Sequence, residues 1–255
     1  MRLALLAPAL ALLLATNSFA LTDKELQVIG RKVWQNECGG TRDGLTSWNT
    51  GENFASLGIG HFIWYPKGVN GPFEESFPKL VGFLKGNGAK VPGWLTSDLD
   101  CPWSTRAEFQ ADFKSARMNE LRDLLADTVP LQSRFLAQRM RDALPKMVSA
   151  SPAGQRDRIR ANFDRLATSG PGTFALIDYV NFKGEGTNPG ERYNGEGWGL
   201  AQVLANMDDS GDPVAAFGKS AAEVLTRRVN NAPPARNEGK WLPGWKNRVR
   251  AYSGA

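Results

Sequence analysis

The sequence predicts an α+β fold that is mostly helical and carries one small early β-hairpin or sheet. Three observations support this class. Apolar residues recur at helical spacing over most of the chain from about residue 22, and only one early region, residues 45–64, has the character of strands. The sequence has no internal repeat or low-complexity tract. A helical majority beside one early hairpin is typical of α+β domains.

The first helix is predicted to begin near residue 22, because Thr22 caps its first turn while Glu25 bonds back to Thr22. One face of this helix then carries, at spacings of three or four residues, Leu26, Ile29, Val33 and Glu37. Gly39-Gly40 should end the helix just beyond Glu37. Three apolar neighbours therefore place the Glu37 carboxyl group at the edge of a hydrophobic core.

A hairpin should follow, with strands at residues 45–48 and 54–64 joined by an Asn49-Thr50-Gly51 turn. Gly58 and Gly60 lie inside the second of these segments. Glycines within a strand indicate a bulge or the close approach of another group.

The remainder reads as helices joined by short loops. We expect helices around residues 73–84, from a Ser104 cap to about residue 125, and around residues 131–144, 156–166, 173–182, 198–207, 222 and 247. Residues 184–199 form a glycine-rich loop.

Residues 1–20 have the pattern of a secretory signal peptide, with Arg2, an apolar run and Ser18-Phe-Ala20 before the expected cleavage site. Residues 21–255 would form a single domain. No later segment approaches the roughly 20 apolar residues that a membrane span requires. The sequence thus predicts a soluble monomer, periplasmic or secreted from a bacterium.

The formal net charge is only +5, which argues against a nucleic-acid-binding protein but suits contact with an anionic polymer such as a bacterial cell wall. Basic residues crowd the last 30 positions, from Arg227-Arg228 to Arg248 and Arg250. This tail is either a solvated basic helix or a specific anion site.

Cys38 and Cys101 are the only cysteines. In an exported protein such a pair predicts a disulfide, which would fix the residue next to Glu37. Two buried thiols are the alternative.

His61 is the only histidine, and this excludes several kinds of chemistry. A catalytic zinc site needs more imidazoles, and no strand-turn-helix segment presents a nucleophilic serine. Carboxylates therefore remain as the candidate catalytic groups. Partial desolvation and the negative end of the helix dipole would both keep Glu37 protonated for general-acid catalysis, whereas a solvated glutamate at a helix end is the alternative.

The segments Glu37-Cys-Gly-Gly and Gly58-Ile-Gly-His61, with the hairpin between them, resemble the catalytic module of the lysozyme superfamily, closest to phage-type muramidases. The resemblance implies that Glu37 is the general acid, and it places Ser56 where that family has threonine. It is weaker over residues 173–204 and 222–250, which look like the helical lobe. A small lobe over roughly residues 38–100 and a helical lobe over roughly residues 101–255 are implied.

The sequence departs from the family at the second catalytic carboxylate. Glu52 is the main candidate, although it is a glutamate where the family usually has aspartate, and it is farther from Glu37 along the chain than in the phage-type pattern. Asp43 is another candidate. Glu52 would stabilise the oxocarbenium-like centre or activate water, with the distance between the carboxyls deciding retention or inversion. If Glu52 is only a turn residue, Glu37 acts alone, as in lytic transglycosylases, and Ser56 orients a water or a sugar hydroxyl.

A saccharide cleft needs flat apolar faces and matched hydrogen-bonding groups. The candidates for substrate binding are Trp48, Tyr65, Asn181, Glu185, Tyr193, Trp198 and Gln202, with Trp64 as a further hairpin aromatic. Glu185 is also the reserve catalytic candidate. His61 is expected to be structural and bonded to Asp98 or Asp100.

The resemblance thus implies a peptidoglycan-cleaving glycosidase that acts on the β-1,4 bond between N-acetylmuramic acid and N-acetylglucosamine, as a muramidase or a lytic transglycosylase, with no metal or organic cofactor. A glycan-binding protein without catalytic activity is one alternative. The other is a chitosanase-like hydrolase, because Glu185, Glu191 and Glu196 form an acidic group suited to a cationic polymer.

Overall fold

The computed structural model describes residues 21–71, 73–95 and 100–253. The predicted signal peptide lies outside these residues. The helices are α1 (Asp23–Cys38), α2 (Phe77–Gly86), α3 (Arg106–Ala111), α4 (Ala116–Asp127), α5 (Val129–Ala150), α6 (Arg156–Ala167), α7 (Gly170–Lys183), α8 (Leu200–Asn206), α9 (Pro213–Asn231) and α10 (Leu242–Arg250). The strands are β1 (Thr46–Ser47), β2 (Ala55–Leu57), β3 (Phe62–Trp64), β4 (Arg192–Tyr193) and β5 (Glu196–Gly197).

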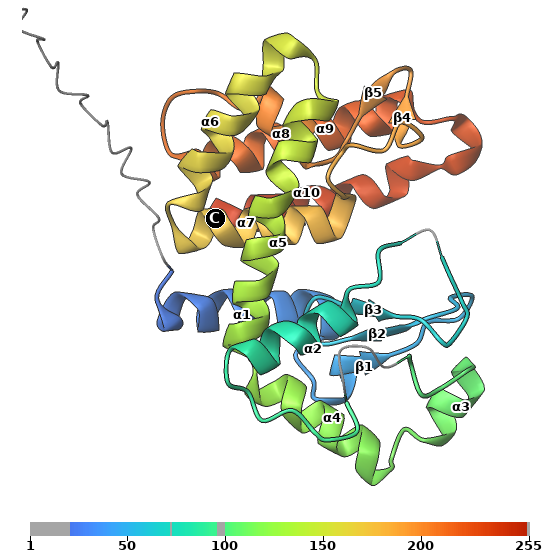
Figure 1. Ribbon diagram of the computed structural model, residues 1–255. Coiled ribbons are helices and arrows are strands. Elements are labelled where there is room, and N and C mark those ends of the chain that lie inside the picture. Colours follow the sequence, from blue (N-terminus) through green and yellow to red (C-terminus); the bar gives the residue numbers. More distant parts are fainter. Residues whose placement is uncertain (1–20, 72, 96–99, 254–255) are drawn as a thin grey trace, which may run out of the picture.

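The predicted class is confirmed: a small, early, antiparallel three-stranded sheet accompanies a larger helical part (Figure 1). The sheet has the order β1-β2-β3, with Thr46 opposite Leu57 and Ser56 opposite Ile63. α5 runs from the group formed by α6 to α10 down to the sheet and α2 (Figure 1). It packs against α1, α2, α6 and α7, so one long helix joins the two parts.

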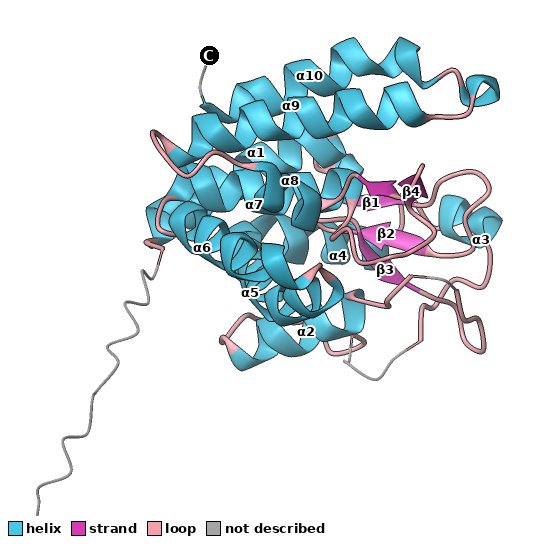
Figure 2. Cartoon of the chain, turned by 90° about the horizontal axis from the view of Figure 1, so that it is seen from above, coloured by secondary structure: helices cyan, strands magenta, loops and turns pink. Residues whose placement is uncertain are grey.

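The first helix forms as predicted, with the reciprocal Thr22–Glu25 cap at its start and Gly39 in the left-handed conformation after its end. Its apolar face packs against α5 and α7. α9 and α10 lie side by side above these helices in the second view (Figure 2). The C-terminal helix thereby reaches the end of α1 where Glu37 lies.

The prediction of one strand over residues 54–64 is wrong, because a tight turn at Gly58–His61 divides it into β2 and β3. Gly58 has φ of +69° and His61 has φ of +47°. Glycine adopts this backbone region without steric cost, so here the glycines mark a turn.

Two further predictions differ from the structure. The helix expected from Ser104 to residue 125 is two helices, because Thr105 caps α3 and Ser115 caps α4. The loop at residues 184–199 contains the short β4–β5 hairpin. Among the described residues, no helix is both long enough and apolar enough to cross a bilayer.

Candidate functional site

Glu37 lies in the last turn of α1 with its side chain only 17% exposed. The buried residues Ile29 and Val33 share its helix face. The helix ends one residue later, at Cys38. The apolar stripe therefore holds this carboxyl group at the edge of the core, as the spacing predicts.

A cation from the far end of the chain contacts Glu37. Arg248 Nη2, on α10, donates a hydrogen bond to Glu37 Oε1 at 2.6 Å. The same guanidinium donates from Nε and Nη2 to the two oxygens of Asp178 on α7, both at 2.8 Å. Burial by itself would lower the pKa of Arg248. The hydrogen bonds and negative charges of Asp178, and after it of Glu37, outweigh burial, so the pKa of Arg248 is raised.

Asp178 anchors this arrangement. Its side chain is 1% exposed and also accepts hydrogen bonds from the Tyr252 hydroxyl at 2.6 Å and Asn36 Nδ2 at 3.0 Å. Burial raises the pKa of Tyr252 well above its usual value, and the negative charge of Asp178 adds to this effect. Asp178 thus holds Arg248 in place, and Arg248 holds Glu37.

His61 lies on the other side of Glu37. Its Nδ1 is 3.9 Å from Glu37 Oε2, and its side chain is 33% exposed. The carboxylate beside His61 is therefore Glu37 rather than the expected Asp100, because the turn at Gly58 directs the histidine toward the end of α1. Asp98, the other expected partner, lies outside the described residues.

The turn at Gly58 is fixed from two helices. The buried Gln132 side chain on α5 accepts a hydrogen bond from the Ile59 amide at 3.0 Å. The Cys38 thiol at the end of α1 donates to the Gly58 carbonyl at 3.5 Å. The motif Gly58-Ile-Gly-His61 therefore places His61 next to Glu37.

Replacing Gly58 with alanine should lower the free energy of unfolding by at least about 2 kcal/mol. A Cβ there would lie 2.5 Å from Gln132 Oε1 and 3.1 Å from the Phe62 ring, at a φ of +69°. Urea denaturation of Gly58→Ala and Gly86→Ala tests this, since a Cβ at Gly86 meets nothing within 4 Å. Equal stability of the two variants would contradict the structural role of the turn.

A groove of about 840 Å³ lies beside His61. One wall comes from the β3 side of the sheet and residues 73–76, and the other from the end of α7 and the loop that follows it. Arg139 and Lys146 of α5 contribute, as do Arg228 of α9 and Arg236. A second cavity of about 400 Å³ shares Asn181 and Glu185 with this groove, so the two are adjacent.

Four predicted substrate residues line the groove: Asn181, Glu185, Tyr193 and Trp198. The rings of Tyr193 and Trp198 have centroids 4.6 Å apart. The Tyr193 hydroxyl donates to Glu238 Oε1 at 2.9 Å. Glu185 Oε2 accepts a hydrogen bond from Lys146 at 2.9 Å.

Three other predicted substrate residues do not line it. Trp48 and Tyr65 are buried among core aromatics, and the Trp48 indole donates to the Glu52 carbonyl at 2.9 Å. The Gln202 side chain accepts from the Gly199 amide at 3.0 Å and donates to the Gly186 carbonyl at 3.1 Å. It closes the glycine-rich loop on itself.

The structure does not place Glu52 and Ser56 in the groove lining. Glu52 lies in the β1–β2 turn, where its amide donates to the Asn49 carbonyl at 3.3 Å. Ser56 is in β2, 4% exposed and paired with Ser47 and Ile63. Glu37 is not among the groove-lining residues either, but it lies next to one of them, because His61 Nδ1 is 3.9 Å from Glu37 Oε2.

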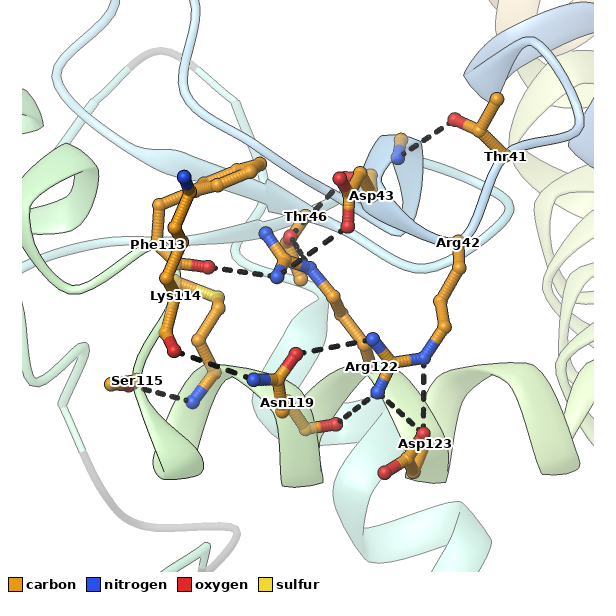
Figure 3. A network of polar contacts seen from close by, with 12 residues as sticks. Thr41, Arg42, Asp43, Thr46, Phe113, Lys114, Ser115, Asn119, Arg122 and Asp123 are labelled. Carbon is orange, nitrogen blue, oxygen red and sulfur yellow. Dashed lines mark hydrogen bonds and ion pairs between the residues drawn. The ribbon is translucent and has the colours of Figure 1, made fainter.

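Asp43, the other candidate for a second carboxylate, faces a buried arginine (Figure 3). Arg122 Nη1 lies 3.6 Å from Asp43 Oδ1. Arg122 also donates to the Thr46 hydroxyl and the Phe113 carbonyl, both at 2.8 Å. Burial lowers the pKa of Arg122, and the charge of Asp43 opposes this shift. Asp43 thus takes part in a network that joins the start of β1 to α4.

Cys38 and Cys101 are both buried and both free thiols in the structure. Burial raises the pKa of each to about 12. The disulfide stays a prediction for the oxidised protein.

Sequence reasoning missed Arg248 and Asp178 as parts of the site. Arg248 belongs to the basic tail, where it pairs with two carboxylates of the protein itself. Comparison of the chain with protein-family models, curated proteins and solved structures gave no match.

Proposed function

We propose that this protein is a peptidoglycan-cleaving glycosidase with a lysozyme-like fold, in which Glu37 is the general acid. One observation carries the proposal: a part-buried carboxyl group at the end of α1 is oriented by Arg248 and lies 3.9 Å from His61, which lines a groove between the sheet and the helical part. The part-buried Tyr193 ring offers a face for a pyranose ring, and Asn181 offers an amide for sugar hydroxyl or acetamido groups. Trp198 supports Tyr193 from behind, because it is only 7% exposed and has the Arg228 guanidinium 4.1 Å from its ring centroid.

The lytic transglycosylase route fits best, because both candidates for a second carboxylate are placed elsewhere: Asp43 faces Arg122, and Glu52 lies in the β1–β2 turn. Glu37 would donate its proton to the glycosidic oxygen as the bond to the anomeric carbon of N-acetylmuramic acid breaks. The 6-hydroxyl oxygen of the same sugar would bond to that carbon, and its proton would return to the Glu37 carboxylate. No water is consumed, and the product is an anhydro sugar.

Arg248 suits the second half of this cycle, because a neighbouring cation favours the ionised form of Glu37. Its hydrogen bond goes to Oε1. No hydrogen bond to Oε2 is recorded within the described residues, so Oε2 is the oxygen to carry the transferred proton. The guanidinium would then stabilise the carboxylate that remains after proton donation.

Mass spectrometry of digested muropeptides tests this proposal. We expect products lighter by one water than the hydrated disaccharide-peptides, because the sugar hydroxyl takes the place of water. A hydrated product would instead assign a hydrolase and would require a water-activating group. An unchanged wall would contradict the glycosidase proposal.

A glycan-binding protein without catalytic activity is the second candidate, favoured by the engagement of Glu37 by Arg248. Co-sedimentation with insoluble walls and no released sugar would support it. A chitosanase-like activity has less support, because Glu185 is paired with Lys146 and Glu196 lies 3.4 Å from Arg227. This pairing removes much of the negative charge that a cationic polymer would need.

A further inference from the structure

Lys183 is a lysine of the groove that forms no ion pair with any of the described residues. It is the last residue of α7 and lines the groove. Its Nζ lies 3.9 Å from the ring centroid of Phe182 and 3.5 Å from that of Trp245. Aromatic faces attract an ammonium group but do not neutralise it. The two rings therefore position a charge that is left uncompensated.

The other cations of the groove are already paired. Among the described residues that line it, every other lysine or arginine forms an ion pair: Arg139 with Glu74, Lys146 with Glu185, and Arg228 and Arg236 with Glu238. No ion pair of Lys183 is recorded in this part of the chain. An added anion would thus find one cation that is not already held in an ion pair.

The charges facing Lys183 come from three elements: Arg228 on α9, Arg248 on α10 and Glu238 in the short helix Glu238–Trp241. Glu238 is buried and accepts hydrogen bonds from Arg228 at 2.8 and 3.0 Å and from Tyr193 at 2.9 Å. Burial, and then the charge of Arg228, lowers the pKa of Lys183 to about 7. A bound anion would relieve this excess of positive charge.

We propose that Lys183 binds a carboxylate carried by the muramic acid residue of the glycan, and that the protein thereby selects an acidic amino-sugar strand over a neutral one with the same backbone. This inference rests on the proposed function, which places such a strand in the groove. Phe182 links the two sites, because Arg248, the partner of Glu37, has its guanidinium 4.5 Å from the ring that also contacts Lys183. The carboxylate would thus bind close to the candidate acid.

Titration calorimetry at pH 6 with a disaccharide that is not cleaved tests the inference. The ligand is N-acetylglucosaminyl-N-acetylmuramic acid, which lacks the bond that the proposed reaction breaks. Its lactyl methyl ester and chitobiose are the neutral counterparts. We expect the wild-type protein to bind the acid about 10-fold more tightly than the ester, as for one charge-assisted hydrogen bond.

A second arm distinguishes the source of the carboxylate. The same disaccharide carrying a dipeptide has carboxylates only on the peptide, since its lactyl group is amidated. Preference for the free lactyl acid assigns that group, and preference for the dipeptide conjugate assigns the peptide.

Lys183→Met should abolish the preference, and Lys183→Arg should keep it. Raising the pH from 6 to 8.5 should weaken the preference in the wild type, because the lysine loses its charge as the pH passes its pKa of about 7. The arginine variant stays charged and should keep the preference at both pH values. A pH effect left in this variant would come from a group other than residue 183.

Equal binding of acid and ester by the wild type would overturn the inference, as would an unchanged preference in Lys183→Met with its fold intact by circular dichroism. No binding of any of these saccharides would overturn it as well. Selective binding of the acid, together with no cleavage of walls, would support the inference while contradicting the proposed catalytic function.

Discussion

Glu37→Gln is expected to lower the rate of cell-wall lysis by about 10²- to 10⁴-fold, the usual contribution of a general acid. Glutamine has nearly the same size as glutamate, and its carbonyl oxygen accepts the hydrogen bond that Arg248 Nη2 gives to Oε1 at 2.6 Å. It carries no proton for the glycosidic oxygen. Turbidity loss of purified walls measures the rate, and circular dichroism checks that the fold is kept.

Glu185→Gln is the matched control for this loss. Glu185 also lines the groove, is the reserve candidate for the acid and forms an ion pair with Lys146. We expect this variant to change the rate far less than Glu37→Gln. The reverse order would move the catalytic role to Glu185, and unchanged lysis by Glu37→Gln would remove Glu37 from the mechanism.

Local signals explain the parts of the fold that the sequence predicts well. The reciprocal cap at Thr22, the spacing up to Glu37 and the stop at Gly39 all act within a few residues, so α1 could be placed closely. The division of the predicted 54–64 strand is also local in origin. It was missed because a glycine in a strand is compatible with a bulge, with a close approach or, as here at Gly58, with a turn.

The surroundings of Glu37 depend on contacts that no local pattern reports. Arg248 is 211 residues from Glu37 and 70 from Asp178 along the chain. The cluster of basic residues near the C-terminus gives no sign of which arginine turns inward. Asp178 interrupts the apolar run Phe174–Val180 of α7, and an acid within such a run is the one sequence signal that points to a charged partner.

The second carboxylate shows the same limit. Spacing placed Glu52 in the β1–β2 turn, but it did not report that the Trp48 indole donates a hydrogen bond to the Glu52 carbonyl at 2.9 Å there. Sequence patterns assign residues to elements, whereas the groove is formed by the packing of elements that are distant in sequence. Tyr193 and Trp198 were predicted because they are aromatics in a glycine-rich loop, and Asn181 because its amide could reach sugar groups; all three line the groove.

Arg248→Met should lower the free energy of unfolding by about 3–5 kcal/mol, because it removes one partner of a buried ion pair and leaves the other. Asp178 is 1% exposed and would keep only the Tyr252 and Asn36 hydrogen bonds. Methionine replaces much of the aliphatic volume, so the loss reports mainly the charge. Urea or thermal denaturation measures it.

Arg250→Met on the same helix is the control, because this exposed residue has no recorded ion pair in the described chain and should change stability by less than about 0.5 kcal/mol. Equal losses in the two variants would mean that the Asp178 pair contributes nothing measurable.

The double variant Arg248→Met with Asp178→Asn separates the two possible origins of the loss. If the cost is that of an uncompensated buried carboxylate, adding Asp178→Asn should recover part of the stability that Arg248→Met loses. If the losses of stability from the two substitutions instead add, Arg248 and Asp178 each stabilise the packing of α10 against α7 through contacts that do not depend on the other. The double variant removes the uncompensated charge from the core but still leaves Glu37 Oε1 without the hydrogen bond from Arg248. Recovery of stability without recovery of wall lysis would therefore show that Arg248 also positions Glu37.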